Sequence, residues 1–152
     1  MIKKVYTYKD KVLREKCEDI TTNESVSDLV DDLVMTMRKE GGVGIAAPQI
    51  GITKNIFIVE HEGMHVFINP KMIQEYGNEW NFREGCLSIP NKTALVSRKS
   101  NITIEYYDQS WKKHKQNFSG ILARVIQHEY DHLNGILYID HITKIQKALM
   151  LL

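Results

Sequence analysis

The sequence predicts an α+β protein, in which antiparallel strands and hairpins lie between an N-terminal and a C-terminal amphipathic helix. Two segments repeat apolar residues with the 3.6-residue period of a helix. The segments between them alternate like strands and are joined by turn-forming residues. Helices and strands that occupy separate parts of a chain are typical of the α+β class. A chain of 152 residues is expected to form one domain over residues 1–152.

The composition argues against several other classes of protein. Apolar residues make up 43% of the chain, charged residues 26%, and the formal net charge is +1. We interpret the lysines near residues 112–115 as a solvated strand face, so no direct nucleic-acid partner is expected. No stretch has the length of a membrane span or the pattern of a signal peptide. Cys17 and Cys86 are expected to be reduced thiols of a cytoplasmic protein, although they could pair.

The first helix is predicted over residues 26–39. Thr21, Thr22 and Asn23 are candidates for its N-cap, and Gly41-Gly42 is expected to end it. Its apolar face consists of Val26, Leu29, Val30, Leu33, Val34 and Met37. This spacing indicates a helix that packs against the core.

The middle of the chain is predicted to form strands. Residues 55–60 and 64–69 flank His61-Glu62-Gly63, which indicates a hairpin. Asn69-Pro70 is expected to end the second of these strands, and Gly77-Asn78 is a candidate turn.

Further strands are predicted over residues 94–98 and 101–107. Asp108-Gln109-Ser110 then turns the chain into a second hairpin, whose last strand covers residues 111–118. Thr143 is expected to cap a short final helix.

A second amphipathic helix is predicted between Ser119-Gly120, its N-cap, and Gly135, its end. It contains the pattern H-E-x-x-H at His128, Glu129 and His132. Residues four apart share one face of a helix, so the two imidazoles point at one position. Glu129 lies about 100° around the axis, where a general base for a metal-bound water belongs. Such a pattern also arises by chance on surface helices, but its place in this helix favours a C-terminal metal-binding helix.

The third metal ligand is expected upstream of this helix. No Glu follows His132, and Tyr138 stands where a longer zinc motif has its third histidine; His141 fits no known spacing. Cys86 is the natural candidate, because thiolates bind late first-row metals strongly. A buried inert thiol is the alternative interpretation of Cys86.

The glycine-rich stretch from Gly41 to Gly51 lacks the residues of a phosphate-binding loop. It is interpreted either as a tight connection between helix and strand or as a loop that approaches another group closely.

Together these stretches resemble the peptide deformylase family. The three signature patterns occur in order, as G-x-G-x-A-A-x-Q from Gly42 to Gln49, E-G-C-x-S from Glu84 to Ser88, and Q-H-E-x-D-H from Gln127 to His132. The resemblance covers nearly the whole chain and implies a single catalytic domain. It also implies that Cys86, His128 and His132 hold one divalent metal ion. That ion would be Fe(II), with Zn(II), Ni(II) or Co(II) as other occupants.

The implied activity is hydrolysis of the N-formyl group from the initiator methionine of new polypeptides, with release of formate. Metal-bound water would attack the formyl carbon, with Glu129 as general acid and base. The side chain of Gln49 and the backbone N–H of Leu87 would stabilise the developing oxyanion. The residues that correspond to the family's substrate-binding positions are Val43, Gly44, Leu122, Val125 and Ile126.

Residues around the metal ligands are also implied. Glu84 and Arg98 match positions that pair in the family and support the Cys86 segment. Asp131 would either orient a ligand or stand as an exposed carboxylate. One departure concerns Thr93, because some members have an arginine there that contacts the substrate backbone.

The implied partner is an N-formylmethionyl peptide, with the ribosome near the nascent chain as a further partner. The protein is expected to be a monomer with no membrane contact.

Two alternatives to this function remain at this point. One is a metallopeptidase or other amidase that uses the same metal and Glu129. The other is a non-catalytic protein with a structural zinc, for which His141 is the candidate fourth ligand.

Overall fold

The structure is a computed structural model that describes residues 1–22 and 24–152. In chain order its elements are η1 (Lys11–Arg14), α1 (Ser27–Lys39), β1 (Gly44–Ala46), η2 (Ala47–Ile50), β2 (Ile56–Glu60), β3 (Met64–Cys86), β4 (Ile89–Tyr107), β5 (Lys113–Ser119), α2 (Gly120–Leu133), η3 (Tyr138–His141) and α3 (Lys144–Met150). The five strands form one sheet in the order β1-β2-β3-β4-β5, and each pairs with its neighbours antiparallel. The predicted α+β class is therefore confirmed.

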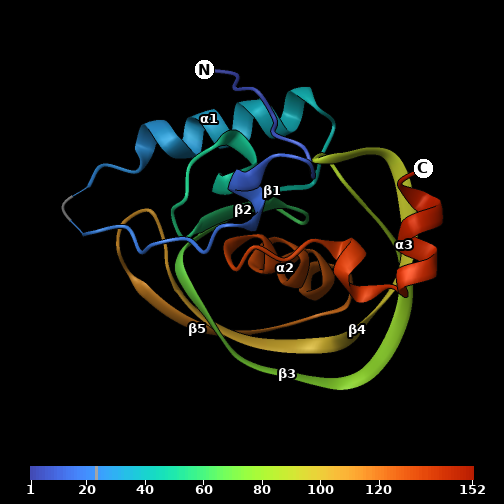
Figure 1. The fold of residues 1–152 in the computed structure, drawn as a ribbon. Helices are drawn as coiled ribbons and strands as arrows, with labels where there is room; N and C mark the ends of the chain where they lie inside the picture. The colour runs from blue at the N-terminus through green and yellow to red at the C-terminus, as the bar shows by residue number, and fades with distance from the viewer. Residues whose placement is uncertain (23) are drawn as a thin grey trace.

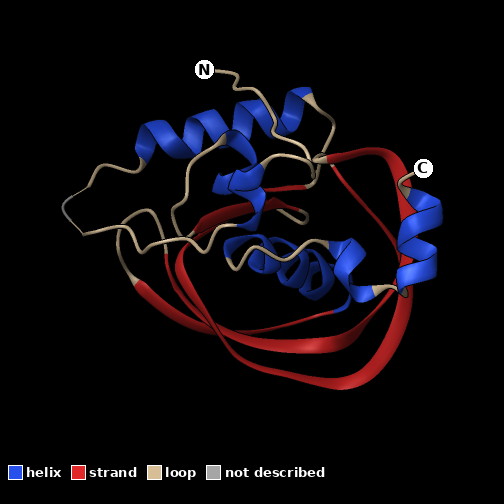
Figure 2. Ribbon diagram, in the orientation of Figure 1, coloured by secondary structure: helices blue, strands red, loops and turns tan. Residues whose placement is uncertain are grey.

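The sheet curves around α2 (Figure 1). Figure 2 shows the strands as an open shell, with α2 inside it and α1 outside, against the end formed by β1 and β2. Strand β2 explains this arrangement, because its residues face alternate sides. Phe57 and Val59 pack in one cluster with Ala123 and Ile126 of α2. Ile56 and Ile58 pack in another cluster, whose other members include Val30, Leu33 and Met37 of α1.

Two predicted breaks in the strand after Met64 are wrong. Asn69-Pro70 doesn't end the strand, and Gly77-Asn78 is not a turn between elements, because β3 continues to Cys86. The pairing of β3 with β4 shifts register between Ile68 and Lys71 and again between Tyr76 and Glu79. A bulge accommodates extra residues in one strand and lets the pairing resume beyond it. The turn-forming residues therefore mark irregularities inside one long strand.

The separate strands predicted over residues 94–98 and 101–107 are likewise one strand, β4. A two-residue turn, Leu87-Ser88, joins β3 to β4, and Cys86 pairs with Ile89 across it. This turn fixes the position of Cys86 at the end of β3, on the edge of the cavity described below.

Helix α1 begins later than its predicted caps. Val26 is its N-cap residue and makes no side-chain capping bond. Thr21 instead donates through its backbone N–H and its hydroxyl to Oε1 of Glu24, in a turn that precedes the helix. The third candidate, Asn23, lies outside the described residues. At the other end of the chain, Thr143 does cap α3, because its Oγ1 accepts a bond from the N–H of Gln146.

Helix α2 runs from Gly120 to Leu133 and carries both histidines and the glutamate of the H-E-x-x-H pattern. Gly135 follows it with a φ of 72°. None of the helices in the described part of the chain is long and apolar enough to cross a membrane.

Candidate metal centre

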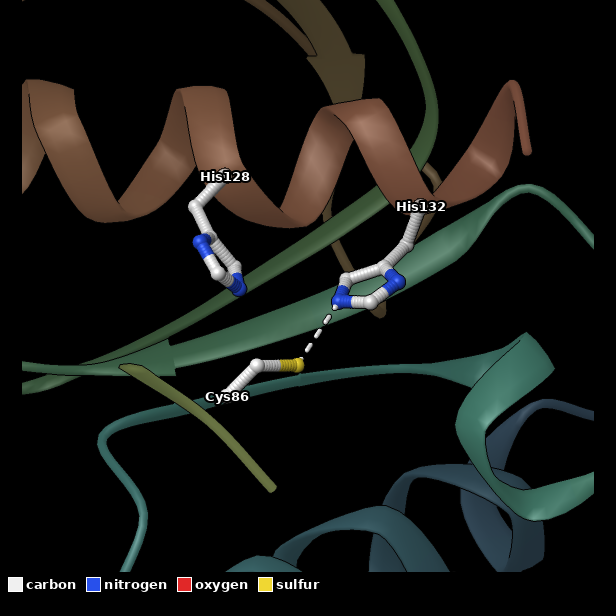
Figure 3. Close-up of side chains that lie close together, drawn as sticks. All are labelled: Cys86, His128 and His132. Atoms are coloured by element: carbon white, nitrogen blue, oxygen red, sulfur yellow. Dashed lines mark hydrogen bonds between the residues drawn. The ribbon is translucent and has the colours of Figure 1, made fainter. Parts of the chain in front are cut away.

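Cys86, His128 and His132 meet at one point between the end of β3 and helix α2. Their potential ligand atoms all lie within 4.8 Å of one another. Figure 3 shows the cysteine side chain directed from its strand towards the two imidazoles, which project from successive turns of the helix. The Sγ atom of Cys86 lies 3.4 Å from Nε2 of His132. Both histidines are buried. Residues 86 and 128 are far apart in sequence, so the fold brings this donor set together.

The donor set fits a divalent metal ion. One thiolate and two imidazoles are ligands that Fe(II), Zn(II), Ni(II) and Co(II) accept. Nδ1 of His128 lies 2.9 Å from Oε1 of Glu84 and is thus occupied, which leaves Nε2 of that ring for an ion. In His132, Nε2 faces the sulfur, while Nδ1 is buried without a hydrogen-bond partner among the described residues.

The electrostatics of the cluster also favour a cation. Burial acts to lower the pKa of His128, but hydrogen bonds to Cys86 and Glu84 outweigh it and raise that pKa well above its usual value. Burial and the charge of His128 hold the pKa of His132 well below its usual value, so this imidazole is neutral. A neutral imidazole is the form that binds metals.

Glu84 is held by a network that includes a second strand. Burial acts to raise its pKa, but hydrogen bonds from His128 and Arg98 and their charges lower that pKa to about 2. Arg98 of β4 donates to both carboxylate oxygens, at 2.7 and 3.1 Å. The predicted pair of Glu84 and Arg98 is thus present, and Glu84 also orients a metal-ligand candidate, as carboxylates next to metal-bound histidines do.

Asp131 extends this network to the surface. Its Oδ2 accepts from Arg98 at 2.9 Å and lies 2.8 Å from Nε2 of His141. His141, the candidate fourth ligand of a structural zinc, is therefore paired with a carboxylate and does not belong to the group formed by Cys86, His128 and His132.

Glu129 lies beside the cluster in a space left by a glycine. Its side chain is buried, and Oε1 has no hydrogen-bond partner among the described residues. A Cβ added to Gly44 would stand 2.7 Å from Oε2 of Glu129. Burial raises the pKa of Glu129 to about 7, and the negative charge of Glu84 adds to this effect. A carboxyl group with such a pKa exchanges protons readily near neutral pH.

Gln49 directs an amide donor at the same place. Its Oε1 accepts from the backbone N–H of Ala46 at 2.9 Å, which fixes the orientation of the amide. Its Nε2 donates to Oγ of Ser88 at 3.1 Å and lies 3.6 Å from Sγ of Cys86. Leu87, in the turn after Cys86, packs so closely on Gly42 that a Cβ there would lie 2.9 Å from Cδ1 of Leu87. The glycine-rich stretch therefore makes two close approaches to the site.

A cavity of about 570 Å³ adjoins these residues. Among the predicted substrate-binding residues, Val43, Gly44 and Val125 line it, whereas Leu122 and Ile126 do not. Ile126 is fully buried in the cluster between α2 and the sheet, and Leu122 packs against that cluster. Each residue turns a helix by 100°, so the cavity face of α2 presents Ile121, Val125 and His128 instead. The predicted lining is corrected accordingly.

Thr93 also lines this cavity, and an arginine reaches it from the neighbouring strand. Nη1 of Arg83 donates to Oγ1 of Thr93 at 3.2 Å, and both residues line the cavity. A guanidinium group is thus present beside Thr93, although the sequence has no arginine at that position.

Arg124 is a residue of the site that the sequence analysis missed. It precedes His128 by one helical turn, is almost fully buried, and donates to Oε2 of Glu84. Its spacing of four from His128 was a signal available in the sequence, but its partner could be identified only from the fold.

Comparisons with known proteins agree on one family. Residues 2–148 match the model of the family described as polypeptide deformylase. A peptide deformylase of Karelsulcia muelleri is 44% identical over 149 residues, which are 93% of this chain and 79% of that protein. One from Christiangramia forsetii is 40% identical, over 99% of this chain and 86% of that protein. A crystal structure of a peptide deformylase from Synechococcus elongatus in complex with actinonin superposes with a TM-score of 0.93 at 32% identity, covering 97% of this chain and 84% of that one.

Proposed function

The chain belongs to the polypeptide deformylase family, a family of hydrolases that remove the N-formyl group from nascent peptides, and from this we propose how its own residues carry out that reaction. We propose that Cys86, His128 and His132 hold one divalent metal ion and that Glu129 moves the proton. The single observation that carries this proposal is the convergence of three ligand atoms within 4.8 Å beside a buried carboxylate oxygen that has no hydrogen-bond partner in the described part of the chain.

The metal ion, when bound, lowers the pKa of a water molecule and polarises the formyl oxygen. The sulfur and two nitrogens accept several ions, and Fe(II) is the proposed native one, with Zn(II), Ni(II) or Co(II) as substitutes. Analysis of the metal in protein purified without oxygen tests this identity.

Glu129 supplies the proton transfers. Its carboxylate accepts the proton of the attacking water as the water oxygen adds to the formyl carbon. It then gives this proton to the amine as the carbon–nitrogen bond breaks, so formate and a free amino terminus are produced. A pKa near 7 suits both directions of transfer.

Gln49 and Leu87 stabilise the charge that develops on the formyl oxygen. The amide of Gln49 is fixed by Ala46 and Ser88, so the N–H that now faces Sγ of Cys86 needs little reorganisation to donate to this oxygen. The backbone N–H of Leu87, in the turn that follows Cys86, is the proposed second donor. Such preorganised donors contribute a large part of the rate enhancement in acyl transfer.

The methionine side chain is proposed to enter the cavity of about 570 Å³. Val43 and Gly44 border it on one side, and Ile121 and Val125 of α2 border it on another.

All groups of the proposed site come from a single chain, so residues 1–152 form one catalytic domain in this proposal and a monomer suffices. Cys17 and Cys86 are free thiols, which agrees with a reducing compartment, and the cytoplasm close to the ribosome is the proposed place of action.

Replacing Glu129 by Gln tests the proposal. The Glu129→Gln variant should keep its metal and lose roughly 10²- to 10⁴-fold in the rate of formate release from a formyl-Met peptide. Glu62→Gln, at an exposed hairpin turn, serves as the matched control and should behave like the parent. The substrate controls are the same peptide with an acetyl group or with a free amino terminus.

Metal-loaded parent protein that releases no formate would overturn the proposed activity. Cleavage of the unformylated peptide would instead favour a metallopeptidase. Full activity of Glu129→Gln would exclude Glu129 as the group that transfers the proton.

A further inference from the structure

Arg124 holds the Glu84 carboxylate from helix α2, while Arg98 holds it from β4. The Arg124 side chain is almost fully buried, and its Nη1 donates to Oε2 of Glu84 at 2.5 Å. Arg98 donates to the same oxygen from Nε at 2.7 Å. The other oxygen, Oε1, accepts from Arg98 at 3.1 Å and lies 2.9 Å from Nδ1 of His128. Each oxygen therefore has two partners, which leaves the carboxylate one orientation.

Arg124 also ties α2 to both long strands. Nη1 donates to the backbone carbonyl of Val96 in β4 at 3.0 Å, and Nη2 donates to that of Trp80 in β3 at 2.5 Å. The guanidinium carbon lies 4.5 Å from the centre of the Trp80 ring. These contacts involve the stretch of paired strands that presents Glu84, because Trp80, Phe82 and Glu84 lie consecutively along one face of β3.

Arg124 is one of three partners of the buried Glu84 carboxylate, besides Arg98 and His128. Asp131 instead pairs with Arg98 and His141. Loss of Arg124 would leave Oε2 of Glu84 with Arg98 alone, and Arg98 also pairs with Asp131. An unbalanced buried charge is costly, and side chains rearrange to reduce that cost. The most direct rearrangement is a rotation of Glu84, which would release the ring of His128.

We propose that Arg124 is a positioning residue of the metal site, which acts by fixing Glu84 and, through it, the orientation of His128. This inference rests on the proposed role of His128 as a metal ligand. The hydrogen bonds of Arg124 go to Glu84, Val96 and Trp80, so its effect on the metal ligands passes through Glu84. Partners that orient a ligating histidine in this way change metal affinity by 10- to 100-fold when they are removed.

Metal affinity of the Arg124→Met variant tests the proposal. Methionine keeps the apolar stem next to Trp80 and removes every N–H donor. Metal-free protein is titrated with Co(II) against a competing chelator, and the absorption bands of bound Co(II) report the ligand geometry. We expect at least tenfold weaker affinity, together with a shift of these bands.

A matched control separates positioning from general loss of stability. Leu33→Ala removes buried apolar contacts between α1 and the sheet and lowers stability without touching Glu84. It should retain the affinity and the spectrum of the parent. Affinity of Arg124→Met within twofold of the parent would overturn the proposal, as would equal weakening in Leu33→Ala.

Arg124→Lys decides the question if the methionine variant fails to fold. Lysine keeps the charge but cannot contact Glu84 and both carbonyls at once, so several-fold weaker Co(II) binding with altered bands is expected. Parent-like binding by this variant would overturn the proposal. If the parent protein itself binds no metal, the proposed function fails, and this outcome is distinct from parent-like binding by the variants.

Discussion

Gly44 shows how a single missing side chain can make room for a catalytic group. The carboxylate of Glu129 occupies the space that a Cβ at residue 44 would take, 2.7 Å from Oε2. Glu129 is buried, so it has little freedom to move aside. The absence of a side chain at Gly44 therefore allows the Glu129 carboxylate, the proposed general acid and base, to lie at this position beside the metal ligands.

The Gly44→Ala variant is expected to keep its metal and lose about 10²-fold in kcat/KM, because a displacement of the order of 1 Å at a reacting group has that cost. Formate release and metal content are the measurements. Gly63→Ala adds a methyl group at the β2–β3 hairpin, where no atom of the described residues lies within 4 Å of it. Its φ of 104° strains the substituted backbone, so this variant should lose some stability but keep the turnover and metal content of the parent. Unchanged turnover by Gly44→Ala would show that Glu129 does not need this space.

The residues of the candidate site divide into those that sequence can predict and those that it cannot. His128, Glu129 and His132 follow from helical spacing, and Cys86 follows from the lack of a downstream ligand. The partners of Arg124 and the burial of Ile126 depend on which face of α2 meets the sheet. That face is set by packing between distant segments, so the predicted pocket lining included two residues that point into the core.

Among the elements, α2 carries most of the site, and its ends depend on two glycines with similar backbone angles. Gly120 at its start has a φ of 65° and Gly135 beyond its end has a φ of 72°. A Cβ at Gly120 would meet no atom of residues 1–22 and 24–152 within 4 Å, whereas one at Gly135 would lie 2.6 Å from the carbonyl oxygen of Arg14. The end of α2 is thus pressed against the N-terminal segment, and Arg14 also donates to the carbonyl of Gly135.

This contrast gives a paired test of the contact at the end of α2. Gly120→Ala should lower the free energy of unfolding by about 1 kcal/mol, because alanine disfavours the left-handed backbone conformation and the added methyl group meets no other obstacle. Gly135→Ala should cost roughly 2 kcal/mol more, because the added atom overlaps a backbone group that cannot rotate away. Urea unfolding of the two variants and the parent measures the difference. Equal losses would show that the N-terminal segment yields to the added methyl group.

Strands were harder to predict from sequence than helices for a local reason. The apolar period of residues 26–39 continues through a single helix, and the structure has α1 at Ser27–Lys39. In β3, by contrast, Asn69-Pro70 and Gly77-Asn78 have the residues of a turn but occur at bulges. A turn and a bulge use the same residue types, and only the partner strand decides whether the ladder resumes.

At the scale of the whole molecule, the proposed metal ion would join two parts of the fold that the chain connects only distantly. Cys86 ends the β3 strand of the shell, and His128 and His132 belong to the helix inside it (Figure 1). The other thiol cannot serve in this way. Cys17 is buried, and burial together with the charge of Glu15 raises its pKa to about 11, so it stays protonated near neutral pH.

Removal of the metal should therefore weaken the entire fold. An ion that binds only the native state at 100 times its Kd adds about 2.7 kcal/mol to the free energy of unfolding, so a chelator should lower the melting temperature by roughly 5 to 10 °C. Cys17→Ala should retain this difference between loaded and chelated protein. Cys86→Ala should lose most of it, because one of the three ligands is gone. If the parent protein, with its metal content verified, melts at the same temperature with and without the ion, the ion does not join β3 to α2 as proposed. A full shift in Cys86→Ala would show that the ion binds elsewhere.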